Sequence, residues 1–285
     1  MLLNPANFIT RNPLEDLSLR FSNSLEAYAA LKIFPAHMVP KKTGSFYVYS
    51  KDNLRVLDTT APSGSEAKSH TYDVSTETFT LKEHAIKGLV LGKDAQDFDT
   101  VVADLDAEMA QQNMDSLLIE LEVAMYAKAC ATGSYAAALV NTLTGGTDTW
   151  LDAGSDPVDD YRELGQEIFE ACGKRPNSSA MSRKSMNILL INPSVLDRVK
   201  YTQLASSEDI LKSLLGMNEF IISDVMKNTA QEGAADVFAE VWGDEVLLFH
   251  KDPANSRKSM TFGKCFMRNQ MYVKSIDAPA LGRDK

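Results

Sequence analysis

The chain has 285 residues, of which 44% are hydrophobic and 24% are charged, and its formal net charge is −10. That is enough apolar material for one large domain or two modest ones, and the acidic balance argues against a surface that binds phosphate backbones. No run approaches the roughly 20 apolar residues of a membrane span, and residues 1–20 lack the layout of a signal peptide. The protein is therefore expected to be soluble and intracellular when it is made.

The three cysteines do not suggest a disulfide framework. Cys130, Cys172 and Cys265 are scattered, odd in number and without metal-ligand spacing. This pattern favours reduced and mostly buried thiols over disulfides.

The first 90 residues predict an N-terminal arm followed by a long two-stranded hairpin. Residues up to about Pro40 lack a strong pattern, so the arm is expected to become ordered only on contact. Residues 45–49 and 71–81 are rich in β-branched and aromatic residues and are predicted strands. The polar stretch between them, with Pro62 and Gly64, predicts a turn or loop. A hairpin of this length is marginal alone, so it is expected to lie on the protein's own body or on another subunit.

The longest helical pattern comes next. Apolar residues recur at helical spacing from Phe98 to Met109 and again from Met114 to Met125, but the two sets are out of step. The mismatch predicts a kink or break at residues 111–113. The main helix is then expected over 113–132, ending before Gly133, with a length of roughly 30 Å.

The second half mixes helices and strands. Residues 136–150 are small and polar and predict a loop with short strands at a boundary, after which Asp156 and Pro157 open a helix that ends at Gly173. Further strands are predicted over 178–181, 219–225, 237–242 and 245–250, and further helices over 183–191, 193–201 and 207–215. A turn at 243–244 is expected to join the last two strands. Residues 259–276 are strand-like again, so the chain is expected to pair with its earlier half in an α+β fold.

Charge is strongly segregated along the chain. Residues 94–122 hold nine acidic and no basic residues, whereas residues 251–274 hold six basic residues against one acidic residue. Two interpretations remain open. The segments are either two solvated faces of opposite bias or complementary surfaces on neighbouring subunits, where charge pairing sets orientation.

Motifs of catalysis are absent from the sequence. There is no Walker loop, dinucleotide fingerprint, zincin helix or Gly-x-Ser-x-Gly elbow. The four histidines have no spacing that would place two on one helix face, and the acids of residues 94–108 lie in no loop motif for a cation. Ser65 to Lys68 matches a Ser-x-x-Lys pattern without its partner motifs. We therefore predict no catalytic, cofactor or metal site, and no enzyme activity.

Several segments carry a resemblance to a known family. Residues 173–177 (GKRPN), 192–202 (NPSVLDRVKYT) and 214–216 (LLG) resemble the major capsid proteins of tailed bacteriophages. The segments Asp156–Pro157, 223–225 (SDV), 228–230 (NTA) and 241–243 (VWG) recur in that family in similar order. The resemblance covers roughly residues 46–253.

This resemblance implies a Hong Kong 97-type capsid fold. Its parts would be an N-terminal arm (1–38), an extended hairpin loop (39–92), a peripheral domain with a long spine helix (93–154), an axial domain (155–255) and a return to the peripheral domain (256–285). The implied function is a structural head protein that forms hexamers and pentamers in an icosahedral shell around double-stranded DNA. Such a protein would be assembled in the host cytoplasm and found in the virion, without cofactors and without membrane contact.

The resemblance also implies partners. The hairpin would lie across a neighbouring copy. The chain is too short in front of its hairpin to hold the long scaffolding segment of some relatives, so a separate scaffolding protein or prior processing is expected, together with a portal. A decoration protein stays open as a further partner. Some relatives form Lys–Asn links between subunits. Lys51, Lys68 and Asn269 are of the right type, but no linking motif is present and no such link is predicted.

The hypothesis assigns six charged residues to subunit contacts: Lys51, Arg55, Lys68, Asp104, Glu108 and Arg268. Two alternatives stay open. An encapsulin-like shell would enclose cargo protein in place of DNA. A small cytosolic oligomer acting as an enzyme or ligand-binding protein would need a pocket with convergent polar groups.

Overall fold

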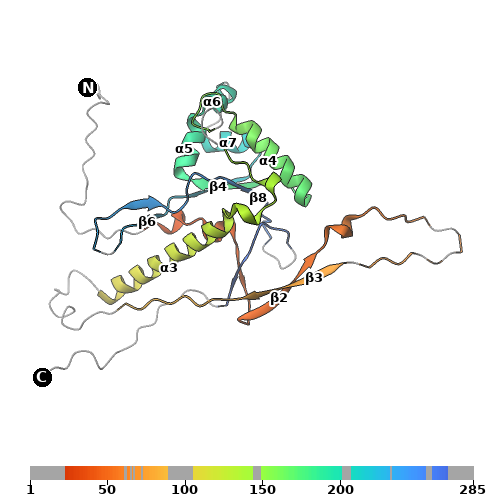
Figure 1. Cartoon of the computed structure of the whole chain (residues 1–285), viewed down its shortest axis with the longest axis horizontal. Coiled ribbons are helices and arrows are strands. Elements are labelled where there is room, and N and C mark those ends of the chain that lie inside the picture. The colour runs from red at the N-terminus through yellow and green to blue at the C-terminus, as the bar shows by residue number, and fades with distance from the viewer. Residues whose placement is uncertain are drawn as a thin grey trace.

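The structure is a computed structural model that describes residues 23–60, 63–64, 66, 68–71, 73–88, 105–143, 149–200, 207–231, 233–254 and 259–268. Figure 1 shows a compact upper part, a long helix beneath it and a hairpin that projects to one side. The strands are β1 (Ala36–Met38), β2 (Thr43–Tyr49), β3 (Val74–Thr80), β4 (Ser178–Ser182), β5 (Glu219–Ser223), β6 (Met226–Asn228), β7 (Phe238–Glu240), β8 (Leu247–Phe249) and β9 (Cys265–Met267). The α-helices are α1 (Ala30–Ile33), α3 (Leu105–Ala129), α4 (Pro157–Cys172), α5 (Arg183–Ile191), α6 (Pro193–Val199) and α7 (Ser207–Leu215). Short 3-10 helices are η2 (Leu25–Ala27), η3 (Lys51–Leu54), η4 (Thr132–Ser134) and η5 (Ala137–Leu139).

The upper part is a three-stranded sheet packed against helices α4 to α7 (Figure 1). Strand β4 is central, parallel to β5 and antiparallel to β8, and every residue of it is buried. Met181 of β4, Leu189 of α5 and Leu211 of α7 meet in one apolar core. The strand and helices predicted here are confirmed, although β5 and β8 are shorter than their predicted ranges.

The ends of α4 form as the sequence predicts. The Asp156 side chain accepts a hydrogen bond from the Val158 backbone N–H, and Pro157 occupies the first turn, where its missing N–H costs nothing. At the other end Gly173 has φ 73°, a left-handed conformation that glycine adopts without a steric penalty.

Asp156 also ties α4 to α6. Its carboxylate accepts hydrogen bonds from the Ser194 hydroxyl (2.8 Å) and from the Arg198 guanidinium (2.6 Å). Burial works to raise the pKa of Asp156. The hydrogen bond from Ser194, the charge of Arg198 and the backbone donors outweigh burial and lower the pKa below its ordinary value.

The long helix is continuous, so the predicted break at residues 111–113 is wrong. Helix α3 runs unbroken from Leu105 to Ala129, about 37 Å at 1.5 Å per residue. One described residue of each apolar set shows that the two sets have different partners at these positions. Met109 lies against Gly88 of the preceding extended segment, whereas Leu118 packs on the central core. The helix ends before the predicted point, and Gly133 lies in η4.

A buried carboxylate on α3 joins four segments of the chain. Glu122 is fully buried. It accepts hydrogen bonds from the backbone N–H groups of Ala29 (3.1 Å) and Ala30 (2.8 Å). The Ser223 hydroxyl (3.1 Å) and the Trp242 indole N–H (2.7 Å) also donate to it. Four donors satisfy a charge that would otherwise be expensive to bury.

Part of the expected arm belongs to this core. Ala29, Ala30 and Ile33 are at most 2% exposed, and Ala27 and Tyr28 join them in the core. For residues 23–38 the expectation of order only on contact is therefore wrong, while residues 1–22 lie outside the described part. The reason is that backbone N–H groups and small side chains hold this segment, and neither produces a periodic sequence pattern.

The return of the chain to its earlier half is confirmed within the described residues. Strand β9 pairs in parallel with β1, from Ala36↔Cys265 to Met38↔Met267. The remainder of the predicted strand, residues 269–276, lies outside the described part.

The predicted hairpin at residues 243–244 is wrong. Strand β7 pairs with β6, and β8 pairs with β4, so the two predicted strands belong to different sheets. Val241 and Trp242 are buried, at 2% and 1% exposure, so the chain enters the core here instead of turning at the surface. Residues 136–150 contain η5 and, in their described portion, none of the predicted short strands. The α+β class is confirmed.

Replacing Glu122 should test how much its hydrogen bonds to the surrounding segments stabilise the fold. Glu122→Gln puts an amide N–H₂ group among four donors, so at least one buried donor loses its acceptor. We expect the free energy of unfolding to fall by about 2–4 kcal/mol in urea unfolding. The matched control is Glu120→Gln on the same helix, where the exposed side chain pairs with exposed His84 and the change should stay within about 1 kcal/mol. Equal effects of the two substitutions would contradict the role of Glu122.

The lowered pKa of Asp156 predicts that the stability of the fold decreases as the pH falls into the acid range. A carboxyl with a lower pKa in the folded state stabilises the fold above its unfolded pKa, about 3.8, and loses that contribution as the pH falls through the folded pKa. Wild type should therefore lose more thermal stability than Asp156→Asn between pH 5 and about pH 2. Parallel melting curves for the two proteins across this range would contradict the prediction.

Candidate assembly surfaces

The projecting hairpin is an antiparallel ladder with a long connection. Strands β2 and β3 pair from Thr43↔Thr80 to Tyr49↔Val74. Both predicted strands are confirmed, with β3 beginning three residues later than expected. The β-branched and aromatic residues suit extended backbone, and their alternation gives the ladder two distinct faces.

Side chains extend the pairing beyond the ladder. The Asn53 side chain donates to the Asp73 carbonyl (3.1 Å) and accepts from the Asp73 N–H (3.0 Å). Further out, Lys68 forms an ion pair with Asp58, which lowers the pKa of that carboxyl. The connection exposes three large apolar side chains, Leu54 (84%), Val56 (100%) and Leu57 (48%). Exposed apolar side chains grouped on one segment indicate a contact surface.

The hairpin is fastened to the body at its root by aromatic rings. Phe266 of β9 stacks on Phe79 with ring centroids 4.5 Å apart, and it also contacts Phe46 (5.8 Å) and His37 (6.2 Å). Gly44 pairs with Phe79 in register, and a Cβ there would come within 2.7 Å of the Phe79 ring. A glycine is therefore required for the ring to reach Phe266.

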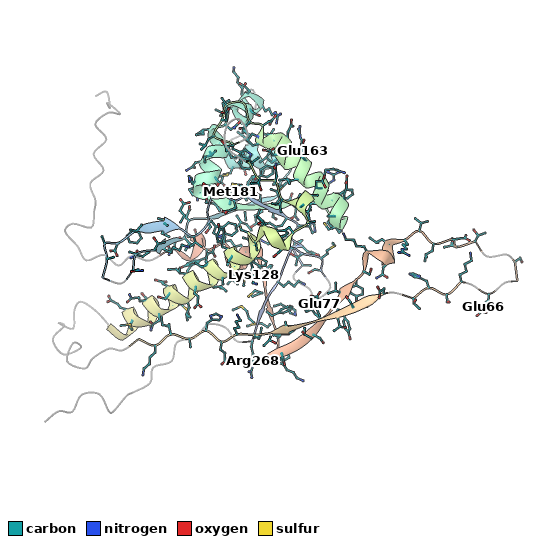
Figure 2. The ribbon with its side chains drawn as sticks, in the orientation of Figure 1. Glu66, Glu77, Lys128, Glu163, Met181 and Arg268 are labelled. Atoms are coloured by element: carbon teal, nitrogen blue, oxygen red, sulfur yellow. The ribbon has the colours of Figure 1, made fainter. Side chains whose placement is uncertain are left out.

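Five of the six predicted interface residues are described, and all five are exposed. Lys51, Arg55 and Lys68 lie on the connection of the hairpin, Glu108 lies near the start of α3, and Arg268 follows β9. Asp104 is outside the described residues. Figure 2 shows Arg268 beneath the hairpin root and Glu66 at the far end of the connection. The connection of the hairpin and the start of α3 lie on opposite sides of the molecule, so one chain does not bring the predicted cations and Glu108 together (Figure 1). Their role in subunit contacts stays a prediction.

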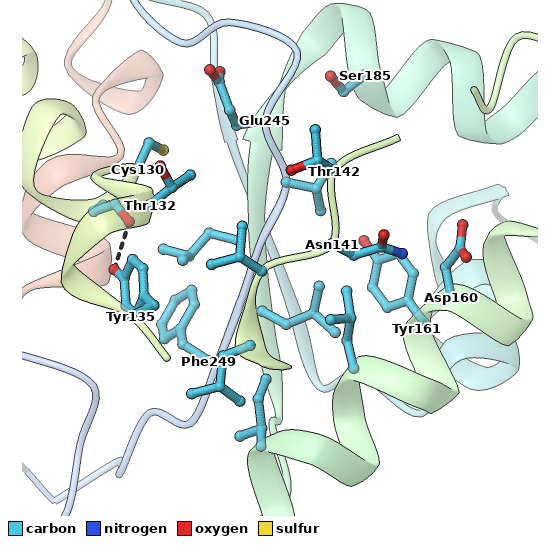
Figure 3. Close-up of a pocket in the computed structure, with 18 of the residues that line it drawn as sticks. Cys130, Thr132, Tyr135, Asn141, Thr142, Asp160, Tyr161, Ser185, Glu245 and Phe249 are labelled. Carbon is cyan, nitrogen blue, oxygen red and sulfur yellow. Dashed lines mark hydrogen bonds between the residues drawn. The ribbon is translucent and has the colours of Figure 1, made fainter. Parts of the chain in front are cut away.

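An open cavity of about 860 Å³ lies between the segment after α3 and the upper part (Figure 3). Its lining is mainly apolar and includes Leu139, Leu164, Ile168 and Phe249. A cavity of this size and lining falls within the range of ligand sites, so its polar groups decide what chemistry it supports.

Several of those polar groups form hydrogen bonds within the chain, whereas the buried Thr261 hydroxyl has no hydrogen-bond partner. Asp160 accepts a hydrogen bond from the Trp150 indole (2.7 Å), and Glu245 accepts one from the Tyr126 hydroxyl (2.7 Å). The Tyr135 hydroxyl donates to the Ala129 carbonyl (2.6 Å), the bond dashed in Figure 3. Burial, with a smaller effect of Glu245, raises the pKa of Cys130 to about 12, so this thiol is protonated and unreactive at neutral pH.

Thiols and metal-ligand residues add no further site in the described residues. The three cysteines are free and partly buried, which is less burial than predicted. No group of three or more His, Cys, Asp or Glu side chains that is suited to a metal ion occurs within the described ranges. Among the described helices, none has the length and apolar character of a membrane span.

Two side chains that position the hairpin and the core are not predicted from the sequence. Glu122 is one of the nine acids of residues 94–122, although its place in an apolar stretch of helix (Leu121, Val123) is a signal of burial. Phe266 lies in the strand-like stretch 259–276, where no local pattern sets it apart. Neither contact is local, because Glu122 bonds residues 92 to 120 positions away and Phe266 contacts rings more than 180 positions away.

Removing the Phe266 ring should loosen the hairpin without unfolding the upper part. Phe266→Ala deletes the stacking surface of Phe79 and Phe46, so amide hydrogen exchange in residues 43–49 and 74–80 should accelerate by about tenfold or more. Exchange in β4 and β5 should stay unchanged. Phe266→Tyr, which keeps the ring, is the matched control. Unaltered exchange in the alanine variant would show that the root is held by other contacts.

Comparison with known proteins gives two substantial matches. The chain is 20% identical over 237 residues to the major capsid protein of Burkholderia phage BcepMu, covering 82% of this chain and 74% of that protein. Its structure matches the crystal structure of a phage-related protein from Bordetella bronchiseptica RB50 with a TM-score of 0.64 and 23% identity, covering 86% of this chain and 80% of that one. A weaker likeness, with a TM-score of 0.47 and 12% identity, is to the capsid of the cyanophage P-SCSP1u, covering 86% and 78% of the two chains. No protein-family model matches the chain.

The sequence match and the fold match each extend over most of both chains. The chain is therefore similar in sequence to a phage major capsid protein and shares its α+β fold with the Bordetella phage-related protein.

Proposed function

We propose that the chain is a structural capsid subunit that assembles with copies of itself into the shell of a phage particle. The observation that carries the proposal is the hairpin: a two-stranded ladder with an extended connection, held at its root and exposing Tyr47, Leu54 and Val56. Such a unit is marginal alone and gains stability when a surface covers it. The sequence similarity to a phage major capsid protein supplies the kind of assembly.

The finer form of the proposal follows the predicted parts. The hairpin (39–92) crosses a neighbouring copy, the segment 93–154 supplies the spine helix, and the segment 155–255 faces the axis of a hexamer or pentamer. The shell is icosahedral and encloses double-stranded DNA. A separate scaffolding protein and a portal act as partners, and the protein resides in the virion. The hydrogen bonds that Glu245 and Asp160 of the cavity accept from Tyr126 and Trp150 fit a structural role for these carboxylates.

Assembly of the purified chain tests the proposal. Negative-stain electron microscopy and light scattering should be run on the chain alone, with a molecular crowder and with a co-expressed scaffold. Closed shells, or rings of five and six, are the expected result. A small oligomer of fixed size under every condition would contradict it. The contents of purified shells then separate two cases, because nucleic acid supports a phage head whereas a cargo protein supports an encapsulin-like compartment.

Charge reversal at the start of the spine tests the proposed pairing between the acidic helix and the basic hairpin. Asp104→Lys with Glu108→Lys should block shell formation, because like charges would then face Lys51 and Arg55 of the neighbour. The monomer should keep its melting temperature, since Glu108 is exposed. Glu163→Lys, at the exposed surface of α4, is the matched control and should assemble normally. Normal shells from the double variant would remove these residues from the interface.

A further inference from the structure

The two faces of the hairpin differ in a way that decides which of them meets another molecule. Cross-strand pairs share a face, so the register groups Thr43, Ser45, Tyr47 and Tyr49 of β2 with Thr80, Thr78, Thr76 and Val74 of β3. We call this set the tyrosine face. Phe46, Val48, Glu77 and Phe79 lie on the opposite face.

The opposite face is the one that the protein's own body uses. Phe266 stacks there on Phe79 and Phe46, and along β2 the residues of that face are half-buried while those of the tyrosine face are exposed. Tyr47 is 72% exposed, Tyr49 59% and Val74 39%. The hairpin projects from the body beyond this root (Figure 1).

The composition of the tyrosine face suits a protein partner. Its eight residues include no charged side chain, whereas the opposite face carries Glu77, labelled on the hairpin in Figure 2. Tyrosine offers a large, stiff contact area and is enriched in protein interfaces. Nucleic acid requires a basic footprint, which this face lacks.

Charge then selects among protein partners. The chain carries a net charge of −10, so the net long-range electrostatic force between two copies is repulsive. A neutral face lets like-charged copies approach without burying unpaired acids. A strongly basic partner would instead be drawn to the acidic surfaces.

We infer that the tyrosine face, centred on Tyr47, Tyr49 and Val74, is the surface by which the hairpin packs on a second copy of this chain, while Phe266 on the other face fixes its direction. The inference rests on the proposed capsid function and adds to it which side of the hairpin makes the contact. Phe266 is in this view a positioning residue, and the two tyrosines are contact residues.

Three variants of the full chain test the inference in the assembly assay. Tyr47→Ser with Tyr49→Ser should raise the protein concentration needed for shells by about tenfold or more. Tyr47→Phe with Tyr49→Phe keeps the rings and should assemble like wild type. Glu77→Gln changes the opposite face and should also assemble like wild type. Hydrogen exchange of the β2–β3 ladder shows whether the serine variant still forms the hairpin.

Hydroxyl-radical footprinting of wild type gives a second measurement that needs no variant. Modification of Tyr47 and Tyr49 should fall by about fivefold or more between unassembled protein and shells, because burial in an interface removes them from water. This measurement decides the matter if the serine variant loses its hairpin.

The outcomes separate the inference from the proposed function. Two results would overturn the inference and leave the capsid function standing. In the first, wild type forms shells but Tyr47 and Tyr49 stay unprotected. In the second, wild type forms shells and the serine variant assembles at the same protein concentration. A Glu77→Gln variant that fails as badly as the serine variant would overturn the choice of face. Absence of shells from wild type under every condition would overturn both.

Discussion

The buried carboxylate of Glu122 is the constraint on which the rest of the structure depends. It lies on the long helix and accepts hydrogen bonds from the N-terminal segment, from Ser223 at the end of β5 and from Trp242 before β8. A buried charge without these donors would cost several kcal/mol. The helix, the N-terminal segment and the sheet are therefore stable only together, and the long helix acquires a fixed place against the upper part.

The segment that Glu122 holds is also connected to the hairpin. The segment held by Glu122 continues into β1, β1 pairs with β9, and β9 carries Phe266 to the hairpin root. A chain of local contacts thus connects the core to a feature that projects far from it. The body of the protein fixes the root and leaves the outer ladder exposed, and this arrangement suits a segment whose partner is another molecule.

The cavity beside the long helix illustrates why a large pocket alone does not indicate catalysis. Its carboxylates already accept hydrogen bonds from Trp150 and Tyr126, and burial keeps the Cys130 thiol protonated. Reactive sites need a nucleophile or a base that is free to act on a substrate. Here the two carboxylates join segments of the chain through these hydrogen bonds.

The sequence by itself determined the local elements and the family resemblance. Asp156, Pro157 and Gly173 set the ends of α4, the β-branched residues of 43–49 and 74–80 set the hairpin strands, and the order of elements set the α+β class. These features are encoded within a few neighbouring residues. Only the tertiary structure decided that α3 is continuous, that residues 23–38 belong to the core, that β7 and β8 lie in different sheets, and that Phe266 fastens the hairpin. Each of these depends on contacts between residues far apart in the chain, such as Glu122 with Ala30, and long-range contacts leave no periodic pattern in the segments that make them.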